Sequence, residues 1–111
     1  MWSIQKGKPD VDENAKQIAE LLKVLANENR LMVLCGLMES AKTVGELAKY
    51  VPNITQSALS QHLTLMKAYG ILDFHKTGQR ITYSIADHRV EEIINVLRQY
   101  YCLEEGGESN A

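Results

Sequence analysis

Apolar residues recur every three or four positions along most of the chain, a spacing that places them on one face of an α-helix. Residues 11–26 are predicted to form the first helix, with an apolar face made of Ala15, Ile18, Ala19, Leu22 and Leu25. Asn27 interrupts this pattern and can cap a second helix, which extends to about residue 39. Residues 40–42 are expected to form a loop.

Short capping signals define the middle of the chain. Thr43 and Glu46 have the spacing of a capping box, so they predict the start of a short third helix, which ends at residues 52–53. Thr55 can cap a fourth helix, and Gly70 suits the left-handed position that follows a helix end. The inward positions of the fourth helix are Leu59, Leu63 and Met66.

The pattern changes from helix to strand after Gly70. Residues 71–75 and 79–85 predict two strands joined by a turn at Thr77 and Gly78. In the second strand Ile81, Tyr83 and Ile85 alternate with polar residues, as in a strand with one buried face. The chain is therefore expected to be mainly α-helical with a small β-hairpin, in the order of a winged helix-turn-helix.

The last helix is predicted to begin after Asp87 and is apolar around most of its circumference. Such a helix has two partners to pack against. One is the core of its own chain, and the other is most simply a second subunit, joined through the first helix as well. We expect one domain over residues 11–103, a flexible arm over residues 1–10 and a disordered polar tail over residues 104–111.

The distribution of charge along the chain says more about function than the net charge does. The net charge is −2, yet residues 40–85 carry five basic and two acidic side chains, and the acidic excess lies before and after them. The positive charge thus falls on the predicted fourth helix and hairpin, as in a protein that binds DNA. No apolar run has the length of a membrane span or a signal peptide, so a cytoplasmic protein is expected.

A polar helix face followed by a basic hairpin is typical of DNA reading. The alternative is an ordinary solvated helix face, but the order of helix, turn, helix, glycine and basic hairpin favours DNA. The sequence leaves two alternatives for His62: a side chain that contacts phosphate, or a partly buried side chain that forms a hydrogen bond within the protein. The predicted DNA-binding residues are Thr55, Gln56, Ser57, Ser60, Gln61, His62, Thr64, Lys67, Lys76, Gln79 and Arg80.

Four segments resemble the ArsR/SmtB family of bacterial repressors: residues 25–31 (LANENRL), 44–48 (VGELA), 56–63 (QSALSQHL) and 78–84 (GQRITYS). The resemblance extends over residues 12–103. It implies a homodimeric winged helix-turn-helix that represses genes from an imperfect palindromic operator of double-stranded DNA until an inducer releases it. An enzyme, such as a small thiol oxidoreductase, is a weaker alternative, because the residues offer no catalytic triad and no cofactor loop.

Metal sensing, which is known in this family, does not fit the sequence. The Cys-x-Cys motif of one branch is absent from residues 43–47. In the other branch Asp and His ligands line the last helix, but here Arg89 and Tyr100 occupy ligand positions. Zinc needs about four well-placed ligands, so neither site can be built.

The only two cysteines are Cys35 and Cys102, and they have no spacing typical of zinc or redox motifs. One interpretation is two buried thiols that behave as small hydrophobic residues. The resemblance favours another, because the persulfide-sensing branch of the family has cysteines in the same two helices. It implies that reactive sulfur or an oxidant links Cys35 to Cys102 and weakens operator binding. A repressor without a thiol switch, controlled by another ligand or a protein partner, is the alternative.

Overall fold

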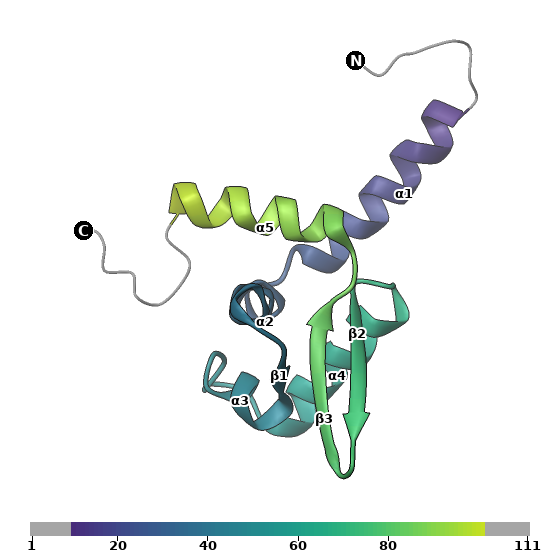
Figure 1. Ribbon diagram of the computed structural model, residues 1–111. Coiled ribbons are helices and arrows are strands. Elements are labelled where there is room, and N and C mark those ends of the chain that lie inside the picture. Colours follow the sequence, from purple (N-terminus) through teal and green to yellow (C-terminus); the bar gives the residue numbers. More distant parts are fainter. Residues whose placement is uncertain (1–9, 102–111) are drawn as a thin grey trace.

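The computed structural model describes residues 10–101, which form five helices and three short strands (Figure 1). Residues 1–9 of the arm predicted at 1–10, the tail predicted at 104–111 and Cys102 lie outside the described residues, whereas residue 10 already belongs to the first helix. In chain order the elements are α1 (Asp10–Leu25), α2 (Glu28–Glu39), β1 (Lys42–Thr43), α3 (Val44–Ala48), α4 (Gln56–Ala68), β2 (Leu72–Thr77), β3 (Arg80–Ile85) and α5 (His88–Tyr101).

The helices begin where the capping residues predicted. Asn27 Oδ1 accepts hydrogen bonds from the backbone N–H groups of Asn29 and Arg30, at 2.9 and 3.2 Å. The capping box of Thr43 and Glu46 is complete, and the Thr55 hydroxyl accepts from the N–H of Ala58. Satisfying these N–H groups matters because the first turn of a helix has no backbone acceptors for them.

The predicted loop before α3 is wrong in part, because Lys42 and Thr43 form strand β1. This strand pairs antiparallel with β3, where Lys42 faces Tyr83, so the sheet has the order β1-β3-β2. The third helix is also shorter than predicted: it ends at Ala48, and Val51 is buried in the turn that follows.

The expectation of one buried face in the second strand of the hairpin is confirmed only near its base. Tyr83 and Ile85 are half-buried, whereas the side chain of Ile81 is 37% exposed. The cause is visible in Figure 1, where the tip of the hairpin extends beyond the helices. The tip is held by strand pairing from Leu72–Ile85 to Thr77–Arg80 rather than by the core.

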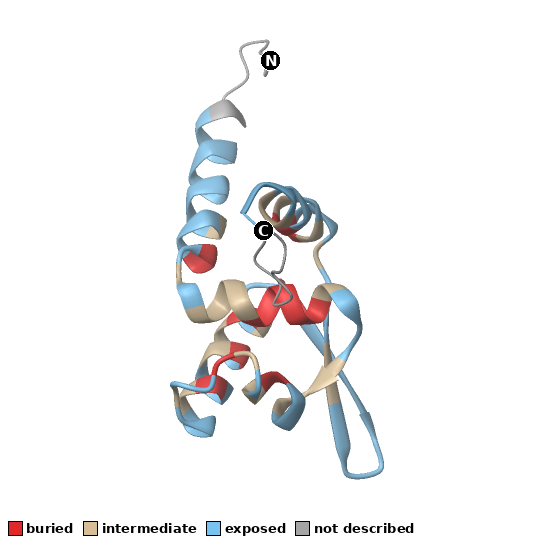
Figure 2. Ribbon diagram, turned by 90° about the vertical axis from the view of Figure 1, so that its left-hand side faces the viewer, coloured by how far each residue is buried: buried red, intermediate tan, exposed pale blue. Residues whose placement is uncertain are grey.

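The core lies among α2, α3, α4 and the start of α5, and only the last turn of α1 reaches it (Figure 2). Val24 and Leu25 are buried, but Ile18 and Leu22 are 40% and 48% exposed. On α5, Val90 and Ile94 are buried and Val96 is exposed. Two helices therefore present apolar side chains to the surface on the same end of the molecule. None of the helices within residues 10–101 is long and apolar enough to cross a membrane.

Candidate nucleic-acid interface

Helix α4 is fixed by one buried face, which leaves its polar face outward. Leu59, Leu63 and Met66 are at most 1% exposed, and the helix packs against α3 and β2. The outward positions are exposed as the sequence predicted, and four of them line one shallow surface with Leu65 and Ala68. The predicted polar residues of this exposed face are Gln56, Ser57, Ser60, Gln61 and Thr64.

Thr55 caps the N-terminus of α4. Its hydroxyl oxygen accepts from the N–H of Ala58 at 3.0 Å. The other N–H groups of the first turn have no acceptor within the helix, and they face the same end as the positive pole of the helix dipole. This helix end can therefore receive a phosphate oxygen.

The hairpin packs against α4 through β2 and places basic side chains at its projecting tip. Lys76, Gln79 and Arg80 are exposed and flank Gly78, whose φ of +64° is the left-handed value that a tight turn needs. The basic tip and the polar helix face are the two parts that a winged helix-turn-helix offers to DNA.

Two contacts join the hairpin to the helices. The Lys67 ammonium nitrogen lies 5.3 Å from the ring centroid of Phe74, which in turn packs edge-on against Tyr83 with 5.8 Å between centroids. The Arg80 guanidinium lies 3.7 Å from a carboxylate oxygen of Glu46 on α3. Lys67 and Arg80 are thus anchored to protein groups while their charge remains at the surface.

Glu46 has two roles in this arrangement. Its carboxylate accepts from the Thr43 N–H at 2.9 Å as part of the capping box, and it also pairs with Arg80. The hydrogen bond from the Thr43 backbone, aided by the charge of Arg80, lowers the pKa of Glu46. The carboxylate is therefore ionised at neutral pH, and it neutralises part of the positive charge of the hairpin.

His62 faces the interior side of α4. Counted at about 100° per residue, it lies about 140° around the helix from Ser57. Its Nδ1 accepts a hydrogen bond from Arg30 Nε at 3.1 Å, so the hydrogen-bonding alternative from the sequence is confirmed. Partial burial, and then the charge of Arg30, lower the pKa of His62. Its contact with phosphate stays a prediction.

Cys35 lies in the buried centre of α2 and is 2% exposed, in agreement with the expectation of a buried thiol there. Helix α2 packs against α5. Cys102 follows Tyr101, the last described residue, in the sequence.

The start of α5 carries charged pairs rather than a metal site. Arg89 binds Asp87 through two hydrogen bonds, at 3.0 and 2.7 Å, and His88 lies 3.2 Å from both Glu91 and Glu92. Within residues 10–101 no group of three or more His, Cys, Asp or Glu side chains is arranged to hold a metal ion.

Sequence patterns did not reveal two contacts around the interface. Arg30 reaches His62 across 32 positions of sequence, and Glu46 pairs with Arg80. Neither follows from periodicity, because the first depends on how α2 crosses α4 and the second on how α3 lies against the hairpin. Only the charge of each residue could have marked it as a candidate.

The arrangement of α3, α4 and the hairpin defines a winged helix-turn-helix, a class of DNA-binding protein. Residues 27–73 match the model for bacterial regulatory proteins of the arsR family. The transcriptional activator HlyU of Vibrio cholerae is 36% identical over 87% of this chain and 93% of its own length. The regulator YgaV of Escherichia coli is 41% identical over 80% of this chain and 90% of its own.

The biofilm growth-associated repressor of Xylella fastidiosa is 32% identical over 86% of this chain and 83% of its own length. The solved structure of reduced HlyU from Vibrio cholerae matches with a TM-score of 0.79 at 35% identity, over 86% of this chain and 99% of that one. The chain belongs to the arsR family and has its winged-helix fold. It is a DNA-binding transcriptional regulator, as members of this family are, and not an enzyme.

Proposed function

We propose that the protein is a homodimeric repressor that leaves its operator when Cys35 and Cys102 become linked. Its partner is double-stranded DNA, so it acts in the cytoplasm. The observation that supports the DNA-binding part is that the polar face of α4 is exposed, and so are the basic residues at the tip of the hairpin. Repression is in keeping with the relative from Xylella fastidiosa, whose name describes a repressor.

In this proposal α4 enters the major groove and the hairpin follows the adjacent backbone. Gln56 and Gln61 have the amide groups that pair with adenine, while Ser57, Ser60 and Thr64 reach bases or phosphates. Lys67, Lys76, Gln79 and Arg80 supply contacts to the phosphate backbone, which position the helix without reading sequence.

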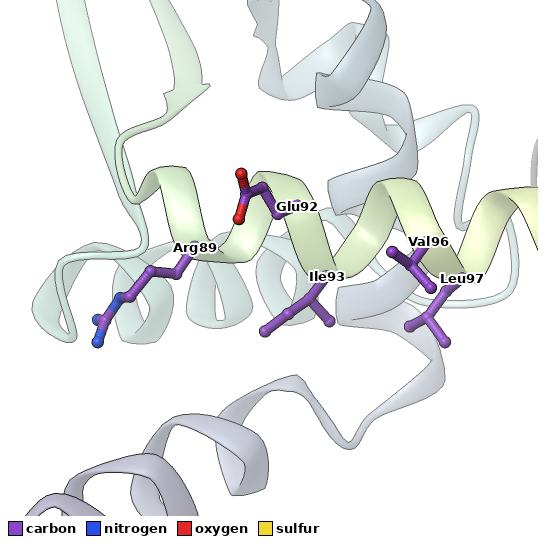
Figure 3. Close-up of a pocket in the computed structure, with 5 residues that line it drawn as sticks. All are labelled: Arg89, Glu92, Ile93, Val96 and Leu97. Carbon is purple, nitrogen blue, oxygen red and sulfur yellow. The ribbon is translucent and has the colours of Figure 1, made fainter. Parts of the chain in front are cut away.

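A second copy of the chain supplies the other half of the DNA-binding surface. Arg89, Ile93 and Leu97 project to the same side of α5, where they line a groove with Glu92 and Val96 (Figure 3). Helix α1 also exposes the apolar side chains of Ile18 and Leu22, and exposed apolar patches mark protein interfaces. Pairing these helices doubles the basic surface and presents two α4 helices to an operator with two half-sites.

The proposed switch uses the two thiols in sequence. One thiolate attacks the sulfane sulfur of a small persulfide, which forms a protein persulfide and releases the donor thiolate. The other thiolate attacks the cysteine sulfur of this adduct, forms the Cys35–Cys102 disulfide and expels HS⁻. If both thiols first take up sulfur, the same expulsion leaves a bridge of three sulfur atoms. Either bridge ties α2 to the chain that follows α5.

A repressor of the same fold without a thiol switch is the second candidate. The burial of Cys35 favours it, because a thiol that is 2% exposed can serve as a core residue alone. The response of a Cys35→Ser variant to persulfide, described below, separates the two.

Alanine substitutions on the exposed face of α4 and at the hairpin tip are expected to weaken operator binding without unfolding the protein. Replacing Gln56 or Gln61 removes a base-pairing amide, which costs about 1–3 kcal/mol when the pair is bidentate. Replacing Arg80 removes a phosphate contact. The slope of the logarithm of affinity against the logarithm of salt concentration should then become shallower by about one. The measurement is fluorescence anisotropy on a DNA fragment that the wild-type protein selects from a random-sequence library.

Ser57→Ala and Ser60→Ala complete the set, and Asn95→Ala on α5, exposed and away from α4, is the control. Thermal unfolding of each variant shows whether the fold is intact. Unchanged affinity in all five variants would contradict this assignment of the surface.

Glu46→Gln is expected to raise operator affinity up to about fivefold, because an exposed ion pair is weak and its loss frees Arg80 for phosphate. The glutamine keeps the capping box, so α3 is preserved. The matched control is Glu28→Gln, another acidic residue in the first turn of its helix. Equal gains in both variants would mean that general charge, rather than the release of Arg80, is the cause.

A further inference from the structure

We propose that Arg30 is a positioning residue that fixes the reading helix α4 relative to α1 by holding His62. This inference rests on the proposed function, since it takes α1 as a dimer helix and α4 as the DNA-reading helix. It concerns neither the DNA surface nor the thiols, but a link between helices inside one subunit.

The first half of the link is the end of α1. Arg30 Nη1 donates to the carbonyl oxygen of Val24 at 2.9 Å. The last four carbonyl groups of a helix have no donor within the helix, and a positive charge there is favourable. The Arg30 guanidinium therefore caps α1 at the turn where the helix enters the core.

The second half is the ring of His62. Arg30 Nε donates to His62 Nδ1 at 3.1 Å, and a nitrogen that accepts carries no proton. The ring is thus neutral, with its proton on Nε2. Leu63, the next residue, is fully buried, so the link reaches α4 on the side opposite to its exposed polar face.

The chemistry of arginine explains why one side chain can do this. The planar guanidinium offers donors in fixed directions, and two of its nitrogens are used here at the same time. A lysine offers its donors from a single point on a flexible chain, without the rigid fork that spans the two acceptors here. Because Ile18 and Leu22 lie on the exposed part of α1 that precedes Val24, a displacement of α1 in the dimer is transmitted through Arg30 to α4.

Three variants test the link: Arg30→Lys, His62→Ala and His62→Asn. We expect Arg30→Lys and His62→Ala each to lower operator affinity about tenfold, with an unchanged dimer dissociation constant. The double variant with Arg30→Lys and His62→Ala should lose no more operator affinity than either single variant, because both changes remove the same contact. His62→Asn should bind operator more tightly than His62→Ala, since its amide oxygen takes the place of the acceptor Nδ1.

A spectroscopic readout separates positioning from simple structural support. Nitrogen-15 NMR of the His62 ring should report one tautomer, protonated at Nε2, in the wild type and a mixture in Arg30→Lys. His88→Ala, on an exposed residue of α5 outside the link, is the control and should bind operator normally.

The outcomes distinguish this inference from the proposed function. Wild-type affinity in Arg30→Lys and His62→Ala overturns the coupling and leaves the repressor intact. An equal loss in His62→Asn and His62→Ala also overturns it, because the acceptor atom would not matter. A wild-type protein that selects no DNA overturns the proposed function itself, and with it the coupling.

Discussion

Linking Cys35 to Cys102 is expected to lower operator affinity about 5- to 150-fold, the range of a coupling energy of about 1–3 kcal/mol between two sites. The physical reason lies in the packing of α2 against α5. A covalent bridge from the buried centre of α2 would restrain α5, and the two α4 helices of the proposed dimer would then fit the spacing of the half-sites less well. The affinity is measured by fluorescence anisotropy on reduced and on persulfide-treated protein.

Cys35→Ser is the decisive variant for this switch. It should bind operator like the reduced wild type and should not respond to persulfide, whereas reduction by dithiothreitol should restore binding in the treated wild type. Cys35→Ala serves as a control for the polar hydroxyl that serine brings into a buried position. A Cys35→Ser protein that is still released by persulfide would contradict the switch and favour control by another ligand.

Val96→Glu is expected to reduce operator affinity by more than about 100-fold, the scale of avidity that two linked binding modules provide. The side chain of Val96 is 50% exposed on the groove of α5. In a symmetric dimer the variant would bury one carboxylate from each subunit, and an unpaired buried charge is costly. Each monomer would then hold only one half-site.

Sedimentation velocity and operator binding, measured on the same sample, test this prediction. Asn95→Glu is the matched control, because it adds the same charge to an exposed position on another face of α5. The control should remain a dimer and bind operator normally. A Val96→Glu protein that is monomeric and still binds with wild-type affinity would show that dimerisation does not matter for DNA binding.

Local signals in the sequence were sufficient to predict most of the helices. The cap at Asn27 and the capping box at Thr43 involve residues only two or three positions apart, so their geometry is determined by the nearby chain. The outward face of α4 could be predicted for a related reason. Once Leu59, Leu63 and Met66 are recognised as the inward set, helical geometry assigns the exposed positions.

Features that depend on distant parts of the chain could not be predicted in the same way. Strand β1 has only two residues, too few for alternation, and it exists because Lys42 meets Tyr83 on β3. The Arg30–His62 hydrogen bond depends on how α2 crosses α4. The exposure of Ile81 follows from the length of the hairpin relative to the helices, which no alternating pattern reports.

The burial of Cys35 bears on both candidate functions, since a core thiol and a resolving thiol can occupy the same position. The two candidate functions differ in whether Cys35 and Cys102 react with each other. Cys102 must be able to reach Cys35, and a direct disulfide requires Cα atoms within about 7 Å, whereas added sulfur atoms extend that reach.

The most direct test of the thiol switch is the intact mass of the reduced protein after treatment with glutathione persulfide, followed by peptide mapping. We expect a Cys35–Cys102 cross-linked peptide, either as a disulfide or with one extra sulfur atom. Two unmodified thiols, in a protein that still binds operator, would contradict the thiol switch.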